Sequence, residues 1–273
     1  MNTVKRIAVL GGGSIGTAIA RGLVGSGQYR PEQITITRRK LDRLQALADR
    51  GFHVTGDNVE AVTSAALIFL TVDPLNLDGL IHEISPALDP SRHVIISIVS
   101  GVSIVEIISL IGKELPVVRA MPNTAIAIQE SMTALAALPG SEHAIEIAKQ
   151  IFDPLGKTLV MAEDQIVPAT ALCACGIAFF LRAIRAASQG GIEIGFHPDD
   201  SLLIASQTAK GAASLLLSHE KHPEQEIDKV TTPRGCTISG LNKMEHEGFS
   251  SSMIRGIVLS AEKAAQLYSR PAK

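Results

Sequence analysis

Three glycines near the start of the chain have the spacing of a phosphate-binding turn. Gly11, Gly13 and Gly16 form the pattern G-x-G-x-x-G, between an apolar run at residues 7–10 and a helical pattern that opens with Ser14. The first glycine permits the tight bend, the second lets backbone approach a pyrophosphate, and the third lets the helix pack on the strand. The helix N-terminus offers N–H groups and a positive dipole end to an anion. The pattern predicts a dinucleotide site; the alternative is a glycine-rich turn without a ligand.

A basic segment follows the next strand pattern. Residues 33–37 alternate like a strand, and Thr37, Arg38 and Arg39 stand at its end. Sites that prefer NAD place an acidic residue about 20 positions beyond the glycines, where it binds the ribose 2′-hydroxyl. Hydroxyl and guanidinium groups instead suit a 2′-phosphate, which a carboxylate repels. We therefore expect NADPH as the cofactor and leave NADH open; the alternative is an exposed basic turn that opens a helix.

A second stretch whose residues could bind a ligand or take part in chemistry lies near the other end of the chain, at residues 228–240. Pro233 interrupts the chain, and Gly235 opens a helix that has Thr237 in its first turn. The backbone N–H groups of such a turn can hold a small carboxylate, and the threonine hydroxyl can contact a substrate nitrogen. Threonine is also common at helix starts for stability alone. Composition and spacing leave both interpretations open.

Other catalytic motifs are missing from the sequence. There is no H-E-x-x-H, no Cys/His metal spacing and no G-x-S-x-G, so we expect no metal site. Cys173 and Cys175 lie two residues apart in an apolar helical stretch. We interpret them as core thiols rather than as ligands or nucleophiles.

The elements that must position these residues alternate between strand and helix up to residue 161. This alternation predicts a doubly wound sheet. Ligands of such sheets lie beyond the carboxyl ends of the strands, so residues 11–15, 71–74, 99–101 and 121–124 should converge on one crevice. The expected strands are 7–10, 33–37, 52–54, 66–72, 93–98, 117–119, 132–137 and 158–161, and the expected helices between them include 41–50, 59–64, 75–87 and 103–111.

Strand patterns disappear after residue 162, and only helical stretches follow. They cover 165–194, 199–218, 224–230, 236–247 and 250–269. The first has few charges between residues 168 and 181, so it should be buried nearly all round. A helix of that kind predicts dimerisation; the alternative is burial within one protomer. The predicted fold class is α/β, with a Rossmann-type doubly wound sheet at 1–162 followed by an all-helical dimerisation domain at 163–273.

Bulk composition restricts the partners. The 273 residues are 46% hydrophobic and 19% charged, and the net charge is −2. Without a basic cluster or many aromatic residues, we expect no nucleic-acid partner. No continuous apolar run reaches the roughly 18 residues that span a membrane, so we expect no membrane partner. The first strand begins too early to leave room for a signal peptide, and an odd cysteine count suits a reducing compartment. We therefore expect a cytoplasmic protein.

Taken together, three motifs resemble those of the pyrroline-5-carboxylate reductase family. They are the glycine loop, R-A-M-P-N-T at 119–124, and V-T-T-P-R-G-C-T-I-S-G-L at 230–241, and the resemblance covers essentially the whole chain. It implies reduction of the cyclic imine 1-pyrroline-5-carboxylate to L-proline by NAD(P)H, in proline biosynthesis. It also implies a homodimer or higher homo-oligomer, with an active site between the two domains that is completed across the dimer.

The resemblance also implies roles for individual residues. Leu10, Gly11, Gly12, Gly13, Ser14, Ile15 and Gly16 would hold the pyrophosphate, and Thr37, Arg38, Arg39 and Asn58 the ribose and its 2′-phosphate. Thr71, Val72, Asp73, Pro74, Val99, Ser100 and Asn123 would line the nicotinamide side. Gly235, Cys236 and Thr237 would bind the substrate carboxylate through their amides, next to Thr232 and Arg234. The Thr237 hydroxyl would be catalytic at the ring nitrogen. Glu163, Thr170 and Glu220 match family positions at or near the substrate pocket.

Several residues depart from the family pattern. The family's S-G-S-G-P-A is C-A-C-G-I-A at 173–178, and its S-P-G-G-T-T or S-P-G-G-A-T is T-P-R-G-C-T at 232–237. Asp73 replaces a frequent lysine, Arg185 an acidic residue and Ala125 a proline. Arg234 restricts a loop that usually has glycine and adds a cation beside the carboxylate site. These departures leave two alternatives: a reductase of another cyclic imino acid, or a non-catalytic NADP-binding regulator or scaffold.

Overall fold

A computed structural model of the chain describes residues 6–219 and 222–267. Their contacts divide the chain into two compact units. The described residues up to 175, with those from 259 onward, form what we call the sheet unit, and residues 176–258 form the helical unit. The sequence places a boundary at residue 162 instead, and that boundary stays a prediction.

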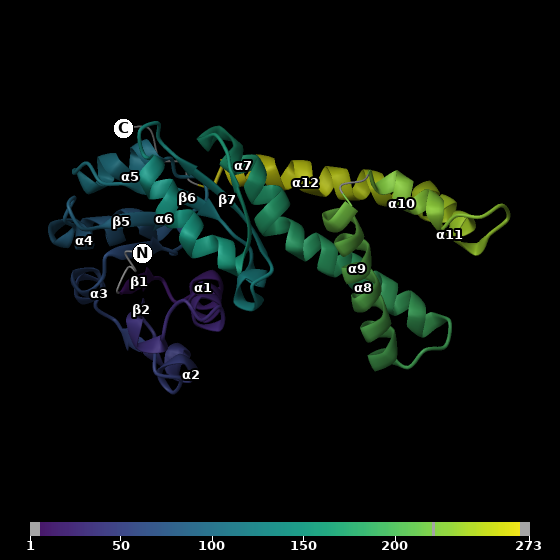
Figure 1. Cartoon of the computed structure of the whole chain (residues 1–273), viewed down its shortest axis with the longest axis horizontal. Coiled ribbons are helices and arrows are strands. Elements are labelled where there is room, and N and C mark those ends of the chain that lie inside the picture. Colours follow the sequence, from purple (N-terminus) through teal and green to yellow (C-terminus); the bar gives the residue numbers. More distant parts are fainter. Residues whose placement is uncertain (1–5, 220–221, 268–273) are drawn as a thin grey trace. The chain divides into compact units, whose positions relative to one another are not determined.

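The described part of the sheet unit contains one mixed sheet with the strand order β3-β2-β1-β4-β5-β6-β7-β8 (Figure 1). The strands are β1 (Ile7–Leu10), β2 (Ile34–Thr37), β3 (His53–Thr55), β4 (Leu67–Leu70), β5 (Val94–Ser97), β6 (Val117–Met121), β7 (Ser131–Ala137) and β8 (Gly156–Val160). Neighbours from β3 to β6 are parallel, and only the β6–β7 pair is antiparallel. The chain leaves β1 toward β2 on one side and later returns to β4 on the other, so the predicted doubly wound sheet is confirmed.

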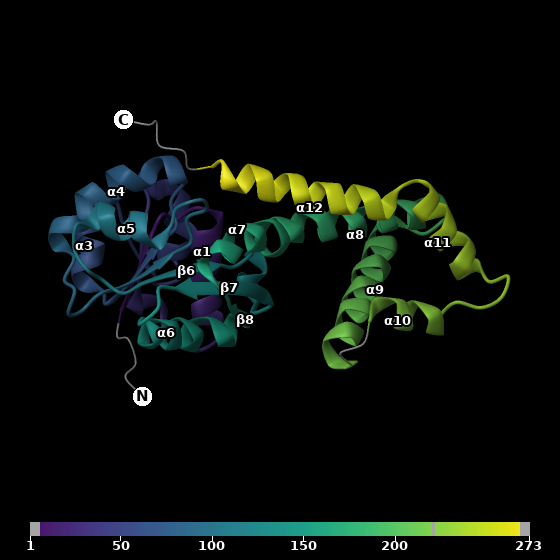
Figure 2. The same cartoon turned by 90° about the horizontal axis from the view of Figure 1, so that it is seen from above.

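Helices cover both faces of this sheet (Figure 2). They are α1 (Ser14–Gly25), α2 (Gln45–Ala48), α3 (Asn58–Ser64), α4 (Leu77–Ile84), α5 (Ile104–Ile111), α6 (Glu142–Phe152) and α7 (Ile166–Ala169). Ile7 and Val9 of β1 pack in one buried cluster with residues of α1 and α6, and Ala8 and Leu10 pack in another with residues of α3, α4 and α5. Alternation along a fully buried strand thus gives each face its own apolar core.

Two predicted helices of the sheet unit are shorter than expected, and one helix was not predicted. The stretch 41–50 contains a one-turn 3₁₀ helix followed by the short helix α2. In the stretch 75–87 the α-helix begins only at Leu77 and ends at Ile84. Helix α6 is amphipathic and lies in a stretch for which we predicted no element.

The predicted helix 165–194 is interrupted. Helix α7 passes into a π-helical turn, Thr170–Cys175, which leads into α8 (Gly176–Glu193). Leu172, Phe180 and Leu181 are each more than half exposed, at 55%, 58% and 58%. The alternative that its own protomer buries this stretch all round is therefore wrong, whereas burial against a second copy stays a prediction.

The same stretch bears on the prediction that no continuous apolar run could span a membrane. Within the described residues, Glu163–Glu193 is long and apolar enough to cross a membrane by length and composition alone. Arg182 and Arg185 interrupt the apolar residues of this stretch, so it reaches that length by mean hydropathy and not as a continuous apolar run. Buried helices of proteins outside membranes share this length and composition.

The helical unit has almost no interior of its own. It contains α8, α9 (Pro198–His219), α10 (Pro223–Lys229), α11 (Cys236–His246) and most of α12 (Phe249–Ala265). Helices α8 and α9 lie side by side in Figures 1 and 2, and the Ser201 hydroxyl donates to the Ser188 carbonyl at 2.7 Å. Among the described residues 176–258, only Gly176, Ser188 and Ser201 are buried. Its large apolar side chains are left partly or largely exposed.

Candidate functional site

Each glycine of the glycine loop has a different neighbourhood. Gly11 has a left-handed φ of +118°, and a Cβ there would lie 2.8 Å from the Thr71 carbonyl oxygen. A Cβ on Gly16 would lie 2.2 Å from the Gly11 carbonyl oxygen, so a side chain would push the helix off the strand. A Cβ on Gly13 would meet no atom within 4 Å. Gly13 therefore faces open space, where a ligand can approach the backbone.

The N-terminus of α1 is open to an anion. Gly13 is its N-cap residue, has extended backbone, and provides no side chain to cap the helix. Gly12 N–H donates to the Thr37 carbonyl at 2.7 Å, and Gly13 N–H donates to the Gly11 carbonyl at 2.8 Å. These two amides stabilise the loop, so the N–H groups of Ser14 and Ile15 in the first helical turn are the donors placed to meet a phosphate.

The glycine loop forms part of a cleft of about 1040 Å³ at the carboxyl ends of β1, β2 and β4. The cleft is lined by Gly11, Gly12, Gly13, Thr37, Arg38, Arg39, Lys40, Gly56, Asn58, Thr71, Val72, Asp73, Leu75, Asn76, Gly79, Leu80 and Glu83. The sequence singled out ten of these residues and missed Lys40, Gly56, Leu75, Asn76, Gly79, Leu80 and Glu83. Lys40 directly follows the two arginines and could have been included, whereas the α4 residues become neighbours only through packing of α4 beside α3.

The β2 end of the cleft is cationic. The Arg38 guanidinium donates through Nη1 to the Gly12 carbonyl at 2.5 Å, which ties it to the glycine loop. Arg39 and Lys40 are exposed. Within the described residues, none of these three cations forms an ion pair. Their charge is therefore uncompensated and available to an anionic ligand.

Two residues after β4 hold neighbouring loops in place. The Thr71 hydroxyl lies 3.0 Å from the Leu10 carbonyl oxygen and 2.9 Å from that of Gly11, so it links the end of β4 to the glycine loop. The Asp73 carboxylate accepts from Leu75 N–H at 3.0 Å and caps the one-turn helix Pro74–Asn76. Both residues line the cleft, and their hydrogen bonds fix the shape of its wall.

The turn after β5 is fixed at both of its ends. Val99 N–H donates to the Ser97 hydroxyl at 3.3 Å. At the other end Ser103 and Glu106 cap α5 reciprocally, with Ser103 N–H donating to the Glu106 carboxylate at 2.8 Å. Neither Val99 nor Ser100 lines the cleft described above.

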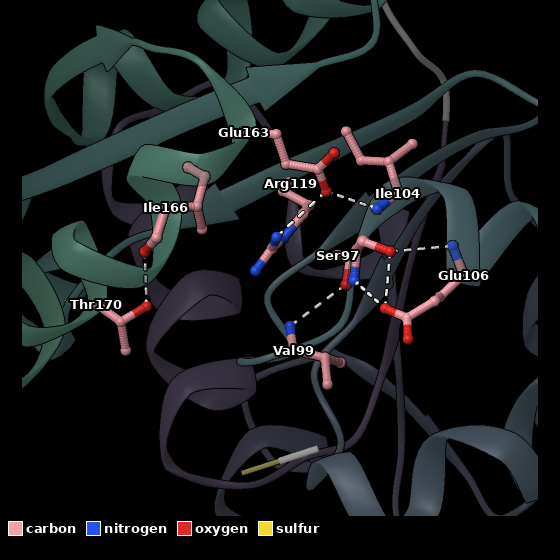
Figure 3. A network of polar contacts seen from close by, with 9 residues as sticks. Ser97, Val99, Ile104, Glu106, Arg119, Glu163, Ile166 and Thr170 are labelled. Carbon is pink, nitrogen blue, oxygen red and sulfur yellow. Dashed lines mark hydrogen bonds and ion pairs between the residues drawn. The ribbon is translucent and has the colours of Figure 1, made fainter. Parts of the chain in front are cut away.

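Figure 3 shows a network of polar contacts beside this turn. The Glu163 carboxylate accepts from Ile104 N–H at 2.6 Å and from Arg119 Nη1 at 3.2 Å. The Arg119 side chain is 5% exposed and that of Glu163 is 23% exposed. The other terminal nitrogen of Arg119 is buried and has no hydrogen-bond partner among the described residues. A residue that the sequence assigned to the substrate pocket is therefore engaged by a buried cation and by the start of α5.

Asn123 and Thr170 use their polar atoms within the sheet unit. Asn123 Nδ2 donates to the Cys173 carbonyl at 3.1 Å, and its Oδ1 accepts from Ala125 N–H at 3.0 Å. The buried Thr170 hydroxyl donates to the Ile166 carbonyl at 2.8 Å. Cys173 is partly buried, and this burial raises the pKa of its thiol, which keeps it protonated.

The loop before α11 lies in the helical unit. Arg234 has a left-handed φ of +56°, a conformation that favours glycine. Gly235 N–H donates to the Thr232 carbonyl at 2.9 Å, and a Cβ on Gly235 would lie 2.5 Å from the Thr232 hydroxyl. No side chain caps α11, so the N–H groups of Cys236 and Thr237 in its first turn are the loop's remaining donors.

Some assigned residues lie elsewhere. Leu10, Ser14, Ile15, Gly16 and Pro74 are neighbours in sequence of lining residues and do not line the cleft with atoms of their own, although the Ser14 and Ile15 N–H groups lie at the open start of α1. Glu220 lies outside the described residues, so its assignment stays a prediction. Within the described ranges, no group of three or more His, Cys, Asp or Glu side chains could hold a metal ion.

Comparisons with known proteins agree on one family. Residues 163–267 match the model described as pyrroline-5-carboxylate reductase dimerisation, and residues 6–101 match that of NADP oxidoreductase, coenzyme F420-dependent. Pyrroline-5-carboxylate reductase 1 of Dictyostelium discoideum is 54% identical over 97% of this chain, but the chain spans only 50% of its length. Pyrroline-5-carboxylate reductase 2 of the same organism is 46% identical, with 96% of this chain and 93% of the relative covered.

Solved structures support the same conclusion. A pyrroline-5-carboxylate reductase from Coxiella burnetii is 28% identical, with a TM-score of 0.84 and coverage of 98% of this chain and 100% of that one. A Plasmodium falciparum pyrroline carboxylate reductase, solved with NADP bound, has a TM-score of 0.89 over 98% of this chain and 100% of its own. Its sequence identity is 22%, so it supports the fold alone.

Proposed function

This chain belongs to the pyrroline-5-carboxylate reductase family, and from that membership we propose that it reduces 1-pyrroline-5-carboxylate to L-proline with NADPH. The observation that carries the proposal is the cleft at the glycine loop, where an open helix N-terminus and uncompensated cations lie along one surface. A relative with this name that the chain covers over 93% of its length favours this reaction over the other two interpretations, another cyclic imino acid or a non-catalytic regulator.

The cleft residues fit a nicotinamide dinucleotide. Open space at Gly13 leaves room for a pyrophosphate against backbone, and the first turn of α1 supplies its N–H donors. Arg38 and Arg39 hold the 2′-phosphate, with Asn58 beside the ribose. When bound, the nicotinamide supplies the hydride that the imine carbon accepts. NADH stays a second cofactor of this cleft.

The loop before α11 holds the substrate in this proposal. Amides in the first turn of α11 bind the carboxylate, and the Arg234 cation reinforces that binding. The Thr237 hydroxyl contacts the ring nitrogen and orients it. Because a protonated imine is already electrophilic, the protein needs little general acid chemistry. The residues accelerate the reaction mainly by positioning the substrate.

A spectrophotometric assay of the full chain tests the proposal. NADPH oxidation is followed with 1-pyrroline-5-carboxylate and, in parallel, with the six-membered cyclic imino acid, and the product is identified by chromatography. We expect one proline formed per NADPH oxidised and faster turnover of the five-membered ring. Faster turnover of the six-membered ring overturns the substrate assignment, and no oxidation with either imine overturns the enzymatic one.

The helical unit supports self-association. Its described residues bury only one glycine and two serines, so this unit lacks an apolar core that could stabilise it alone. Leu203, Leu217 and Ile254 are 68%, 77% and 60% exposed. We infer that a second copy covers these side chains, giving a homodimer or higher homo-oligomer. Light scattering on the purified chain checks this, and a monomer at micromolar concentration contradicts it.

Location and other partners stay proposals as well. We propose a cytoplasmic protein that binds neither nucleic acid nor membrane, because the net charge is −2 and all three cysteines are free thiols. Fractionation of cells checks the compartment, and recovery of the chain in the membrane pellet contradicts it.

A further inference from the structure

A carboxylate lies in the same cleft as the three cations. Glu83 of α4 lines the cleft together with Arg38, Arg39 and Lys40. It is exposed, and within the described residues it forms no ion pair. Its one hydrogen-bond partner there is Asn58, whose Nδ2 donates to Glu83 Oε2 at 2.9 Å. The cleft therefore combines uncompensated positive charge from the end of β2 with uncompensated negative charge from α4.

The contact with Glu83 also sets the orientation of the Asn58 amide. Asn58 is the first residue of α3, where the Asp57 side chain accepts from Glu60 N–H at 2.9 Å and fixes the helix start. Because Nδ2 donates to Glu83, the amide oxygen of Asn58 is the atom turned away from α4. Glu83 thus contributes both a negative charge and a fixed acceptor to the cleft wall.

A carboxylate in a nucleotide cleft discriminates between the two nicotinamide cofactors. It accepts hydrogen bonds from ribose hydroxyls and repels a 2′-phosphate, which is why NAD-preferring sites have one at the end of the second strand. Here that position is cationic, and the carboxylate comes from α4 instead. We propose that Glu83 is a specificity-determining residue that lowers the advantage which Arg38 and Arg39 give NADPH over NADH. This inference rests on the proposed function, because it assumes that the cleft binds these cofactors.

The test compares NADPH and NADH binding by the full chain, measured as Kd from nucleotide fluorescence. Glu83→Gln keeps an oxygen for Asn58 and removes the charge. It should raise the ratio of the NADH Kd to the NADPH Kd about 3- to 10-fold, the effect of one unit charge across a solvated cleft. Glu83→Lys should raise the ratio further. Glu60→Gln makes the same change in net charge from α3 but does not line the cleft, so its ratio should stay within about twofold of wild type.

The outcomes separate this inference from the proposed function. If the wild-type chain binds either cofactor and the ratio is unchanged or falls in both Glu83 variants, Glu83 does not determine specificity, while the proposed function stands. An equal rise in the Glu60→Gln control also overturns the inference, because the effect is then one of net charge. A wild-type chain that binds neither nucleotide overturns the proposed function and this inference with it.

Discussion

Removing the Glu163 carboxylate should destabilise the sheet unit strongly. Glu163→Ala leaves Arg119, whose side chain is 5% exposed, with no partner for either terminal nitrogen within the described residues. Breaking a buried pair in this way costs about 3–5 kcal/mol, and the 23% exposure of Glu163 places the cost at the lower end. The hydrogen bond from Ile104 N–H is lost as well, for about 1 kcal/mol.

The conservative variant should be milder. Glu163→Gln keeps an oxygen for Ile104 N–H and for the guanidinium but loses the charge, so we expect a cost of about 1–2 kcal/mol. For a unit of this size 1 kcal/mol lowers the midpoint by about 2–4 °C, so Glu163→Ala, which loses about 4 kcal/mol in all, should unfold about 8–16 °C lower. Circular dichroism measures the midpoints, and Asp164→Asn, an exposed neighbour, is the matched control with less than about 0.5 kcal/mol expected.

The same variants separate two roles for Glu163. A carboxylate that only binds the substrate raises KM when removed and leaves the unfolding midpoint unchanged. That result, or equal midpoints for the alanine and glutamine variants, refutes the inference that Glu163 serves mainly to neutralise Arg119 and hold α5.

Four further perturbations address the cleft and the fold. Gly13→Ala should keep the fold, because its Cβ meets no atom within 4 Å, but should weaken NADPH binding about 10-fold in calorimetry. Gly16→Ala should instead lower the melting temperature, because its Cβ would lie 2.2 Å from the Gly11 carbonyl oxygen. Unchanged NADPH affinity in Gly13→Ala argues against a pyrophosphate there. Arg38 and Arg39 changed to Ser should weaken NADPH binding about 10- to 100-fold and spare NADH, whereas an equal loss of both contradicts the 2′-phosphate assignment. Burial lowers the pKa of His93 below its usual 6.5, so as pH falls the unfolded chain binds the proton first, and stability is lost below about pH 6.5. His93→Asn should flatten the slope of the unfolding free energy against pH, measured by denaturant titrations. An unchanged slope assigns the pH dependence to other groups.

The sheet could be predicted because its strands are continuous apolar runs. β4 and β5 are buried almost completely, so their sequences contain few polar residues to confuse the pattern. The antiparallel direction of β7 could not be predicted, because alternation along one strand carries no information about the direction of its neighbour. Helix α6 has an amphipathic pattern that could have been found.

Contacts between residues that only tertiary packing brings together could not be predicted from the sequence. Glu83 reaches the cleft because α4 packs beside α3, and the contact of Glu163 with Ile104 joins residues 59 positions apart. The π-helical turn Thr170–Cys175 has no sequence signature comparable to a capping residue or proline. The glycine loop was predictable because each glycine satisfies a local backbone requirement.

The central claim is that the glycine-loop cleft and the loop containing Thr237 act in one reaction. Steady-state kinetics of Thr237→Ala with NADPH and 1-pyrroline-5-carboxylate, together with the NADPH Kd, tests it most directly. We predict a loss in kcat/KM of roughly 10- to 1000-fold, the scale of one lost transition-state hydrogen bond, with the NADPH Kd unchanged. Unchanged kcat/KM contradicts the claim, because Thr237 would then have no part in the chemistry for which the cleft holds the cofactor.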